Sequence, residues 1–393
     1  MIATNKFQYS KPLKLFGIVL LALYPLAIIS GNLLINIFIV LISINFFVNF
    51  KYNKKYFSDK IFYLLIFFFI SILINNIFSI DPQNSFPRTI KILLIIFFIL
   101  EIKRLIEIYK ANNLKYVFLS WSLILVFLSL DIIFETIFGY NIIGIKSYMP
   151  GRIASFFGDE LVAGAFFHGF ILFFLSYLIN MKLKNNNLIF LIIFVVLVSF
   201  FIGERSNFIK IFISVIIFFS LTVKIHYKFK IIITFIILTS VTSFVILQES
   251  YKTRYFDQIK SLFSKNGYSK YLKESQHGAH RNAAIKIFYD NKLFGVGLKN
   301  YRLEVGKKKY ENKKFLKTKI RASTHPHQVH YEILSETGIF GYLSFLIFLT
   351  LSLFYGIKNY AKNKNIYLLS SLIYIITSIY KIKSYETYAQ YFK

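Results

Sequence analysis

The sequence predicts an all-α polytopic membrane protein with about eleven or twelve transmembrane helices. Hydrophobic residues make up 56% of the 393 residues, the mean hydropathy is +0.57, and only 17% of the residues are charged. Soluble domains usually carry about 25% charged residues. A chain with this hydrophobic composition is neither an ordinary soluble enzyme nor a disordered protein. The absence of cysteine from the chain excludes disulfides, cysteine-ligated metals and thiol catalysis.

Eleven stretches of the sequence have about the length and apolar character that a transmembrane helix needs. They lie near residues 14–30, 32–50, 61–79, 89–107, 115–138, 161–180, 186–203, 207–223, 229–248, 338–356 and 365–380. The first is predicted to be an uncleaved helix, because the second follows almost at once. The fourth is the weakest, since Glu101, Lys103 and Arg104 interrupt it. After the last, either the chain ends or a twelfth helix is missing.

Lysine and arginine are distributed as expected for a cytoplasmic N-terminus. The predicted inner segments hold 19 of these residues and the short outer loops hold five, namely Arg88, Lys91, Lys146, Arg152 and Arg205. The net charge of +29 therefore indicates membrane topology rather than nucleic-acid binding. We expect residues 1–248 to form transmembrane helices 1–9, residues 249–337 a periplasmic loop with short helices, and residues 338–393 the C-terminal transmembrane helices and tail.

Three of the seven histidines, His325, His327 and His330, fall within six residues. Ser323 or Thr324 is a suitable helix cap, so we expect a helix to start there and to carry His327 and His330 on one face. The positive end of the helix dipole favours the neutral imidazole that a general base needs. Two other interpretations stay open: a zinc site made by the three histidines, and an interfacial helix whose histidines only contact the headgroup region.

Two arginines are candidate anion ligands on the outer side. Arg205 lies in the tight turn between the seventh and eighth stretches, and its planar guanidinium suits phosphate, although it is equally suited to anchoring a helix end. Arg281 follows His280 and opens a predicted short helix over residues 282–289.

Two glycines, a further arginine and two acidic residues of the predicted outer side are also candidates. The Gly295-x-Gly297 pattern lacks a preceding strand and a complete fingerprint, which excludes a dinucleotide site and predicts a packed turn. Arg152 precedes the sixth stretch. Asp131 and Glu135, at i and i+4, are expected to line a polar cavity, to pair with arginines, or to be ordinary carboxylates at a helix end.

These residues together resemble the O-antigen ligase family of bacterial envelope glycosyltransferases. One pattern is similar to that family's histidine signature. In it, His327-Gln328 is followed by nine residues and then by Gly338-x-x-Gly341. Arg205 and Arg281 look like its two essential arginines. The Phe-Gly-Asp-Glu stretch at residues 157–160 resembles the segment before its sixth helix. The resemblance covers the chain from Arg152 to Gly341.

The resemblance implies a GT-C-like fold and a metal-independent inverting glycosyltransferase of the bacterial inner membrane, without a cofactor. The implied reaction belongs to lipopolysaccharide biosynthesis. It moves O-antigen from undecaprenyl pyrophosphate to a lipid A-core sugar hydroxyl at the periplasmic face. By this resemblance His327 is the catalytic base. The residues expected to bind substrate are Arg205, Arg281, His330 and Arg152, and those expected to shape the motif are Gln328, Gly338, Gly341, Gly295 and Gly297.

Other functions remain compatible with the sequence. An O-antigen polymerase and a protein O-oligosaccharyltransferase use the same lipid-linked donor, so the sequence does not identify the acceptor. A polysaccharide exporter is a further alternative. Transporters tend to carry polar sites at mid-membrane, often within repeats, whereas here the candidate charges gather at one predicted face. That placement favours the enzyme.

Overall fold

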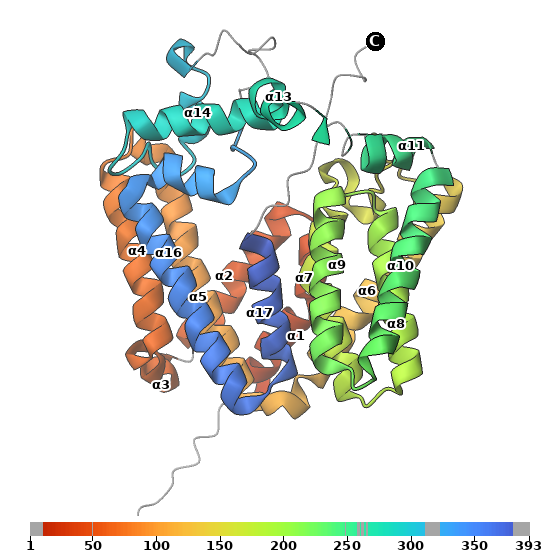
Figure 1. Cartoon of the computed structure of the whole chain (residues 1–393). Helices are drawn as coiled ribbons and strands as arrows, with labels where there is room; N and C mark the ends of the chain where they lie inside the picture. The colour runs from red at the N-terminus through yellow and green to blue at the C-terminus, as the bar shows by residue number, and fades with distance from the viewer. Residues whose placement is uncertain are drawn as a thin grey trace, which may run out of the picture. The chain divides into compact units, whose positions relative to one another are not determined.

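A computed structural model describes residues 11–48, 50–247, 249–257, 260, 263–264, 266–310 and 323–379, and all regular structure in these ranges is helical (Figure 1). The predicted all-α class is therefore confirmed. The helices that contain the eleven predicted stretches are α1 (Lys11–Ile29), α2 (Asn32–Val48), α4 (Lys60–Ile77), α5 (Pro82–Asn113), α6 (Lys115–Phe138), α7 (Ala163–Asn180), α8 (Asn185–Phe201), α9 (Arg205–Thr222), α10 (Tyr227–Leu247), α16 (Val329–Asn363) and α17 (Ile366–Ile379).

Several of these helices have the length and composition of membrane spans. Six of them in the described part of the chain, α4, α6, α7, α9, α10 and α16, are long and apolar enough to cross a bilayer. The apolar parts of α1, α2, α8 and α17 are shorter. The chain is thus a multi-pass membrane protein, while the total of eleven or twelve crossings stays a prediction.

Shorter helical segments connect the long ones. They are α3 (Phe50–Asn53), η1 (Lys54–Ser58), η2 (Ser155–Glu160), α11 (Glu249–Tyr251), η3 (Lys252–Asp257), α13 (Gly267–Glu274), α14 (Gln276–Asp290), α15 (Tyr301–Glu304) and η4 (Lys308–Tyr310). The last six of these lie within the segment 249–337, for which we expected short helices. The division of the chain at residues 248 and 337 describes a topology and stays a prediction.

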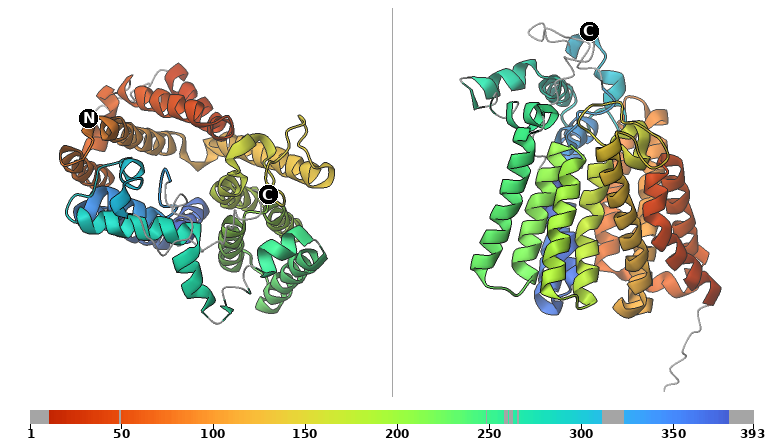
Figure 2. Two further views of the ribbon diagram at one scale, coloured as in Figure 1. Left: turned by 90° about the horizontal axis from the view of Figure 1, so that it is seen from above. Right: turned by 90° about the vertical axis from the view of Figure 1, so that its right-hand side faces the viewer.

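The chain folds as two compact units. The first unit comprises residues 1–59, 94–241 and 365–374, and the second comprises residues 60–93, 242–364 and 375–393. In the first unit α6 packs on α1 and α7, and α7 also packs on α8 and α9 (Figure 2). Polar and aromatic contacts join α17 to this bundle. The rings of Phe118 and Tyr367 stack at 4.1 Å, and the hydroxyls of Ser176 and Ser370 lie 2.6 Å apart.

The charges that interrupt the fourth predicted span do not break α5. Glu101 and Arg104 are fully buried and paired with each other, and Arg104 Nε donates to Glu101 Oε2 at 2.7 Å. The Asn45 amide of α2 donates to the same carboxylate at 2.6 Å. A buried charge is tolerated only when it is paired and hydrogen-bonded. The helix therefore continues through a polar contact that fixes α5 against α2.

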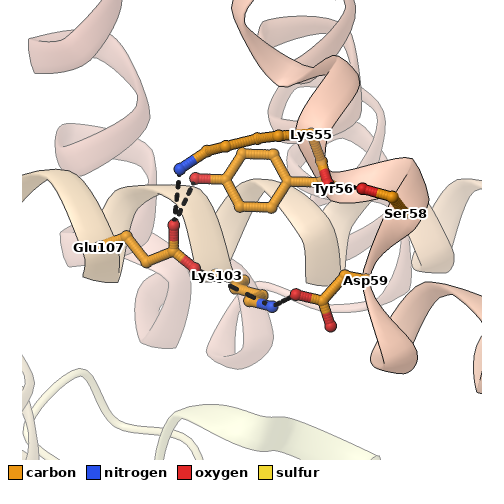
Figure 3. Close-up of polar contacts among 6 residues, drawn as sticks. All are labelled: Lys55, Tyr56, Ser58, Asp59, Lys103 and Glu107. Atoms are coloured by element: carbon orange, nitrogen blue, oxygen red, sulfur yellow. Dashed lines mark hydrogen bonds and ion pairs between the residues drawn. The ribbon is translucent and has the colours of Figure 1, made fainter.

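A second charged contact lies one turn further along α5 (Figure 3). Lys103 pairs with Asp59, while Glu107 accepts hydrogen bonds from Lys55 at 3.1 Å and from the Tyr56 hydroxyl at 2.8 Å. These contacts hold η1 and the residue after it against α5. The basic and acidic residues around the weak fourth span therefore have a structural explanation and need no catalytic role.

The second unit holds most of the candidate residues. α4 packs along α16, and the hydroxyls of Ser71 and Ser344 lie 2.6 Å apart between them. α14 runs across the beginning of α16 (Figure 1). The core beneath α14 contains buried Ile287, Val296 and Tyr301. α14 and α16 thus form one packed body, from which the candidate site is built.

Candidate functional site

The candidate residues belong to both units. Arg152 and Arg205 lie in the first unit, and His327, His330 and Arg281 lie in the second. The two groups are described in turn, beginning with the histidines.

His327 does not lie inside a helix, so the expected helix start at Ser323 or Thr324 is wrong. α16 begins at Val329, with Gln328 as its N-cap residue. The Ser323 hydroxyl instead donates to the carbonyl of His325 at 2.8 Å, which closes a turn before the helix. His327 has φ of +56°, a left-handed conformation that costs a residue with a side chain about 1–2 kcal/mol. Such strain gathers at functional sites.

The ring of His327 lies within a cluster of imidazoles. His280 of α14 is nearly parallel to it, with ring centroids 5.0 Å apart and an interplanar angle of 19°. The ring of His277 lies at 5.5 Å from that of His327, and the ring of His325 at 4.3 Å. We call His277, His280, His325 and His327 the histidine cluster. Its α14 members were missed by the sequence analysis.

Two members of the histidine cluster lie at the beginning of α14. Ser275 caps α14 by accepting a hydrogen bond from the Gly278 amide at 3.0 Å, so α14 begins at Gln276, earlier than expected. His277 and His280 therefore lie in the first turns, where the helix dipole is positive. The ring of His327 thus lies beside the first turns of α14.

The three histidines of the sequence motif do not form one group, because His325 and His327 lie together whereas His330 contacts other residues. The Nδ1 atom of His330 lies 3.2 Å from the hydroxyl of Tyr342, on the helix α16 itself. The Nδ1 atom of His325 lies 2.9 Å from the Thr324 hydroxyl. Within the described ranges, no three or more histidine, aspartate or glutamate side chains form a group that could hold a metal ion. The ligand set suggested by the motif is thus not brought together.

Arg281 lies beside α16. Its guanidinium is 5.5 Å from the centre of the Tyr331 ring, a cation–π contact that orients the side chain. Its buried Nε atom has no hydrogen-bond partner in the described part of the chain. A buried donor without a partner is costly, so Arg281 is well placed to donate to a ligand. Residue 281 follows His280, and the packing of α14 on α16 therefore fixes both the arginine and the histidine.

The Gly295-x-Gly297 turn and the Gly338-x-x-Gly341 pattern bind each other through their backbones. α16 is kinked at Gly338, where φ is +63° and ψ is −166°. The freed carbonyls of Ser335 and Glu336 accept from the amides of Val296 and Gly297 at 3.1 and 2.8 Å. On the other side of the kink, the amides of residues 339 and 340 donate to the carbonyls of residues 292 and 293. We call this exchange the glycine clasp.

Close approach explains why glycine occupies three positions in the glycine clasp. A Cβ atom on Gly295 would overlap the backbone of residue 336, and one on Gly338 would overlap the carbonyl of Leu293. A Cβ on Gly297 would strike the Ser79 side chain. All three glycines have positive φ. The predicted packed turn is therefore confirmed. Gly341 differs, because it lies within the helix and its Cβ would overlap the Thr337 side chain.

Polar residues that the sequence analysis missed support the glycine clasp. The amide of Asn300 donates to Ser79 Oγ at 2.7 Å and to the Val296 carbonyl at 3.0 Å. Asn75 of α4 donates to the carbonyls of Phe294 and Glu336. Buried backbone carbonyls need such partners. A single sequence gives no signal for the contacts with Ser79, Phe294 and Glu336, because these partners are more than 200 residues away in the chain.

Tyr301 connects the core of the second unit to the histidine cluster. Its hydroxyl donates to the carbonyl of His280 at 3.3 Å. Burial, together with the charges of Glu332 and Glu336, raises the pKa of this hydroxyl. It therefore remains a donor at physiological pH and fixes the turn of α14 that carries His280.

The arginines of the first unit surround the turn at residues 203–205. Gly203 has φ of +75°, and a Cβ there would overlap the Gly151 carbonyl, so the tight turn is confirmed. Arg205 begins α9 and is 7% exposed. Arg152 donates to the Leu161 carbonyl at 2.9 Å and lies 3.6 Å from a Glu204 oxygen. Arg152 is thus held by this loop and by a carboxylate.

The two acidic side chains of α6 accept hydrogen bonds from the loops that follow this helix. Asp131 accepts from the Ser155 hydroxyl at 2.5 Å and from the Ile142 amide at 2.9 Å. Glu135 accepts from the amides of Ala154 and Ser155 at 3.2 and 2.6 Å. These carboxylates fix the loop before α7, and in the described residues neither forms an ion pair with an arginine. The side chains of Asp159 and Glu160 lie outside the described residues.

Comparison with known protein families gives a match to part of the chain. Residues 188–346, from α8 into α16, match a family model described as O-antigen ligase. In this segment the chain is similar to the O-antigen ligase family. The O-antigen ligase match includes Arg205, the histidine cluster, Arg281 and the glycine clasp, and it leaves Arg152 outside. The resemblance found in the sequence is thereby confirmed. No curated protein matches the chain.

Proposed function

We propose that the protein is a glycosyltransferase that moves O-antigen polysaccharide from undecaprenyl pyrophosphate to a sugar hydroxyl of the lipid A core at the periplasmic face of the inner membrane. The observation that carries this proposal is that His327, which stacks on His280 of α14, and Arg281 of the same helix belong to one packed body, α14 on α16, within the segment that matches the O-antigen ligase family. The first is suited to accepting a proton and the second to binding a phosphate.

The proposed reaction is a single displacement. The acceptor hydroxyl attacks the anomeric carbon, His327 takes the proton of that hydroxyl, and the bond between the anomeric carbon and the pyrophosphate oxygen breaks. The lipid pyrophosphate leaves with the bonding electrons, so the anomeric configuration inverts. A hydroxyl with a pKa far above neutrality needs such a positioned base. The strained backbone of His327 and the stacked ring of His280 support this role, because both fix the imidazole.

The leaving group needs cations that are fixed before the reaction begins. Arg281 is proposed for this role because Tyr331 orients its guanidinium and its buried Nε atom has a hydrogen bond to give. Arg205 and Arg152 are proposed to contribute from the first unit, and His330 to contact the substrate. Two arginine forks provide the charge stabilisation that a metal ion would otherwise supply, so we propose a mechanism without metal or cofactor.

The glycine motif has a supporting part in this proposal. Gln328 caps α16 directly after the base, and the glycine clasp fixes the kink at Gly338 against the turn that follows α14. Gly295, Gly297, Gly338 and Gly341 thus act through the relative position of α14 and α16 rather than by contacting substrate.

The acceptor is tested by deleting the gene and examining the surface polysaccharide of the host. Accumulated lipid-linked chains with an unmodified lipid A core indicate the ligase, which is the expected result. Lipopolysaccharide with a single repeat indicates the polymerase, unglycosylated protein indicates the protein transferase, and retained donor on the cytoplasmic side indicates an exporter. Each of the last three results would contradict the proposed acceptor reaction.

The chemistry is tested with purified protein and the lipid-linked donor. His327→Ala is expected to abolish transfer at unchanged membrane abundance, and a strong chelator is expected to leave wild-type transfer intact. Transfer by the His327 variant would remove the base assignment. Loss on chelation, with recovery on adding zinc or magnesium, would overturn the metal-independent mechanism.

A further inference from the structure

Three of the five cations on the predicted outer side, Arg88, Lys91 and Lys146, have no part in the proposed transfer. Two of them, Arg88 and Lys91, lie in the first turns of α5. Together with Asn84 they occupy positions i, i+4 and i+7, which share one face of a helix. Lysine and arginine are usually sparse in short outer loops of membrane proteins. Their presence at these two positions therefore indicates a function.

A loop of the same unit adds a third cation to this face. Asn84 donates to the carbonyl of Lys299 at 3.3 Å, and Ser85 donates to that of Leu298 at 2.9 Å. The loop is therefore docked on the first turn of α5. Lys91 lies within electrostatic range of both Arg88 and Lys299. Lys299 has φ of +63°, an unusual conformation for a lysine.

The three cations lack an ion-pair partner in the described residues. Two carboxylates lie in the neighbourhood, and both have other contacts. Glu336 is within electrostatic range of Arg88, but its carboxylate accepts from the amides of Lys299 and Tyr301. Asp81 accepts from the Asn84 amide at 3.0 Å. Like charges held together by a docked loop repel each other, and an anion bound among them removes the repulsion.

The surroundings of the three cations are apolar and exposed. Phe78, Ile80, Phe86 and Ile90 are 54%, 46%, 56% and 43% exposed. Such side chains next to cations, at the point where the apolar part of α5 begins, are typical of the bilayer interface. The anion that fits this surface has a negative head and an apolar tail.

We propose that Arg88, Lys91 and Lys299 bind the phosphate group of a membrane lipid. The phosphate contacts the three cations, and the acyl or prenyl chain lies along the exposed apolar side chains of the α4–α5 turn. Both a bilayer phospholipid and a polyprenyl phosphate have this chemistry. The inference goes beyond the proposed transfer, since it requires lipid binding only and involves no reaction.

Binding is measured by native mass spectrometry of the full chain in detergent, with phosphatidylglycerol, undecaprenyl phosphate and diacylglycerol as probes. We expect the two phosphate lipids to bind and diacylglycerol, which lacks the phosphate, to bind much more weakly. Arg88→Gln and Lys91→Gln are each expected to weaken phosphate-lipid binding by about fivefold, the effect of one basic side chain near anionic lipid. Lys299→Asn tests the third cation, because asparagine tolerates positive φ.

Lys292→Gln is the matched control, since it removes one charge from an exposed lysine of the same unit. Its binding is expected to equal that of the wild type. Arg88→Lys keeps the charge and is expected to retain most of the affinity. Tighter binding of undecaprenyl phosphate than of phosphatidylglycerol assigns the site to the polyprenyl lipid, and equal binding assigns it to the bilayer phospholipid; either supports the proposal.

Three results would overturn the lipid-phosphate site. They are unchanged binding in the three neutralised variants, an equal loss in Lys292→Gln, and full displacement of the lipid by inorganic phosphate at the lipid's own concentration. The outcome is separate from that of the proposed function, because wild-type transfer activity neither requires nor excludes these results.

Discussion

At the scale of single residues, the chemistry of the candidate base depends on neighbours that are remote in sequence. His327 was recognisable from its spacing to Gly338 and Gly341. Its contact with His280 was not, because 46 residues separate the two rings and a single sequence does not report contacts between segments. The spacing of His277, His280 and Arg281 at i, i+3 and i+4 was a usable signal for one helix face. The positive φ of His327 was not predictable, because this region is uncommon for any residue other than glycine, although histidine is among the residues enriched there.

The stacked ring of His280 gives a prediction at this scale. His280 is fully buried and does not contact solvent, so we expect it to position His327 rather than to contact substrate. His280→Ala is expected to lower kcat by about tenfold or more with little change in KM, because a misplaced catalytic group costs rate rather than binding. His280→Phe keeps a ring face and is expected to recover part of the loss.

The kinetic constants are to be measured on purified protein at equal amounts. The control is His226→Ala, which removes an exposed histidine outside the histidine cluster. A wild-type kcat in His280→Ala would show that the stacking has no catalytic consequence. A rise in KM alone would instead assign His280 to substrate binding.

At the scale of elements, apolar patterning predicted the helices well, while their ends depended on tertiary contacts. The stretch 115–138 coincides with α6. α5 runs from Pro82 to Asn113, well beyond the predicted 89–107. Its charged residues do not interrupt it, because Glu101 and Arg104 pair with each other while Lys103 and Glu107 find partners in another segment. The start of α16 was misplaced because Ser323 closes a local turn instead of capping a helix. Side-chain competition of this kind is decided only in the folded chain.

The glycine clasp gives the prediction at the scale of elements. Gly338→Ala places a Cβ against the Leu293 carbonyl in a left-handed conformation, and neither atom is at the end of a flexible side chain. We expect it to lower the free energy of unfolding by at least about 2 kcal/mol, the sum of a backbone cost and an overlap cost. Gly297→Ala is expected to behave similarly, because its Cβ meets the Ser79 side chain and the hydroxyl of the buried Ser85.

Thermal unfolding in detergent is a suitable measurement for these variants. Gly306→Ala is the control, since a Cβ at Gly306 meets no atom within 4 Å, and its midpoint is expected to stay near that of the wild type. Unfolding of Gly338→Ala and Gly306→Ala at the same temperature would contradict the role assigned to the glycine clasp.

At the scale of the whole molecule, composition alone was enough to predict a multi-pass α-helical membrane protein. The division into two compact units was not predictable, because each unit is assembled from separated parts of the chain. Residues 60–93 and 242–364, for example, come together through the hydrogen bonds of Asn75 and Asn300 rather than through any continuous hydrophobic pattern. Topology is the property at this scale that the sequence predicts most directly, through the distribution of lysine and arginine.

The predicted topology can be tested in each unit separately because the chain has no cysteine, so that every introduced cysteine is the only one. Lys146→Cys and Lys184→Cys probe the first unit, and Lys292→Cys and Lys358→Cys probe the second; all four lysines are exposed. In intact spheroplasts, a membrane-impermeant maleimide is expected to label positions 146 and 292. Positions 184 and 358 are expected to react only after the membrane is permeabilised, since they lie in predicted cytoplasmic loops. Labelling of position 358 but not of position 292 in intact cells would show that the second unit has the opposite orientation. It would then contradict the assignment of His327 and Arg281 to the periplasmic face.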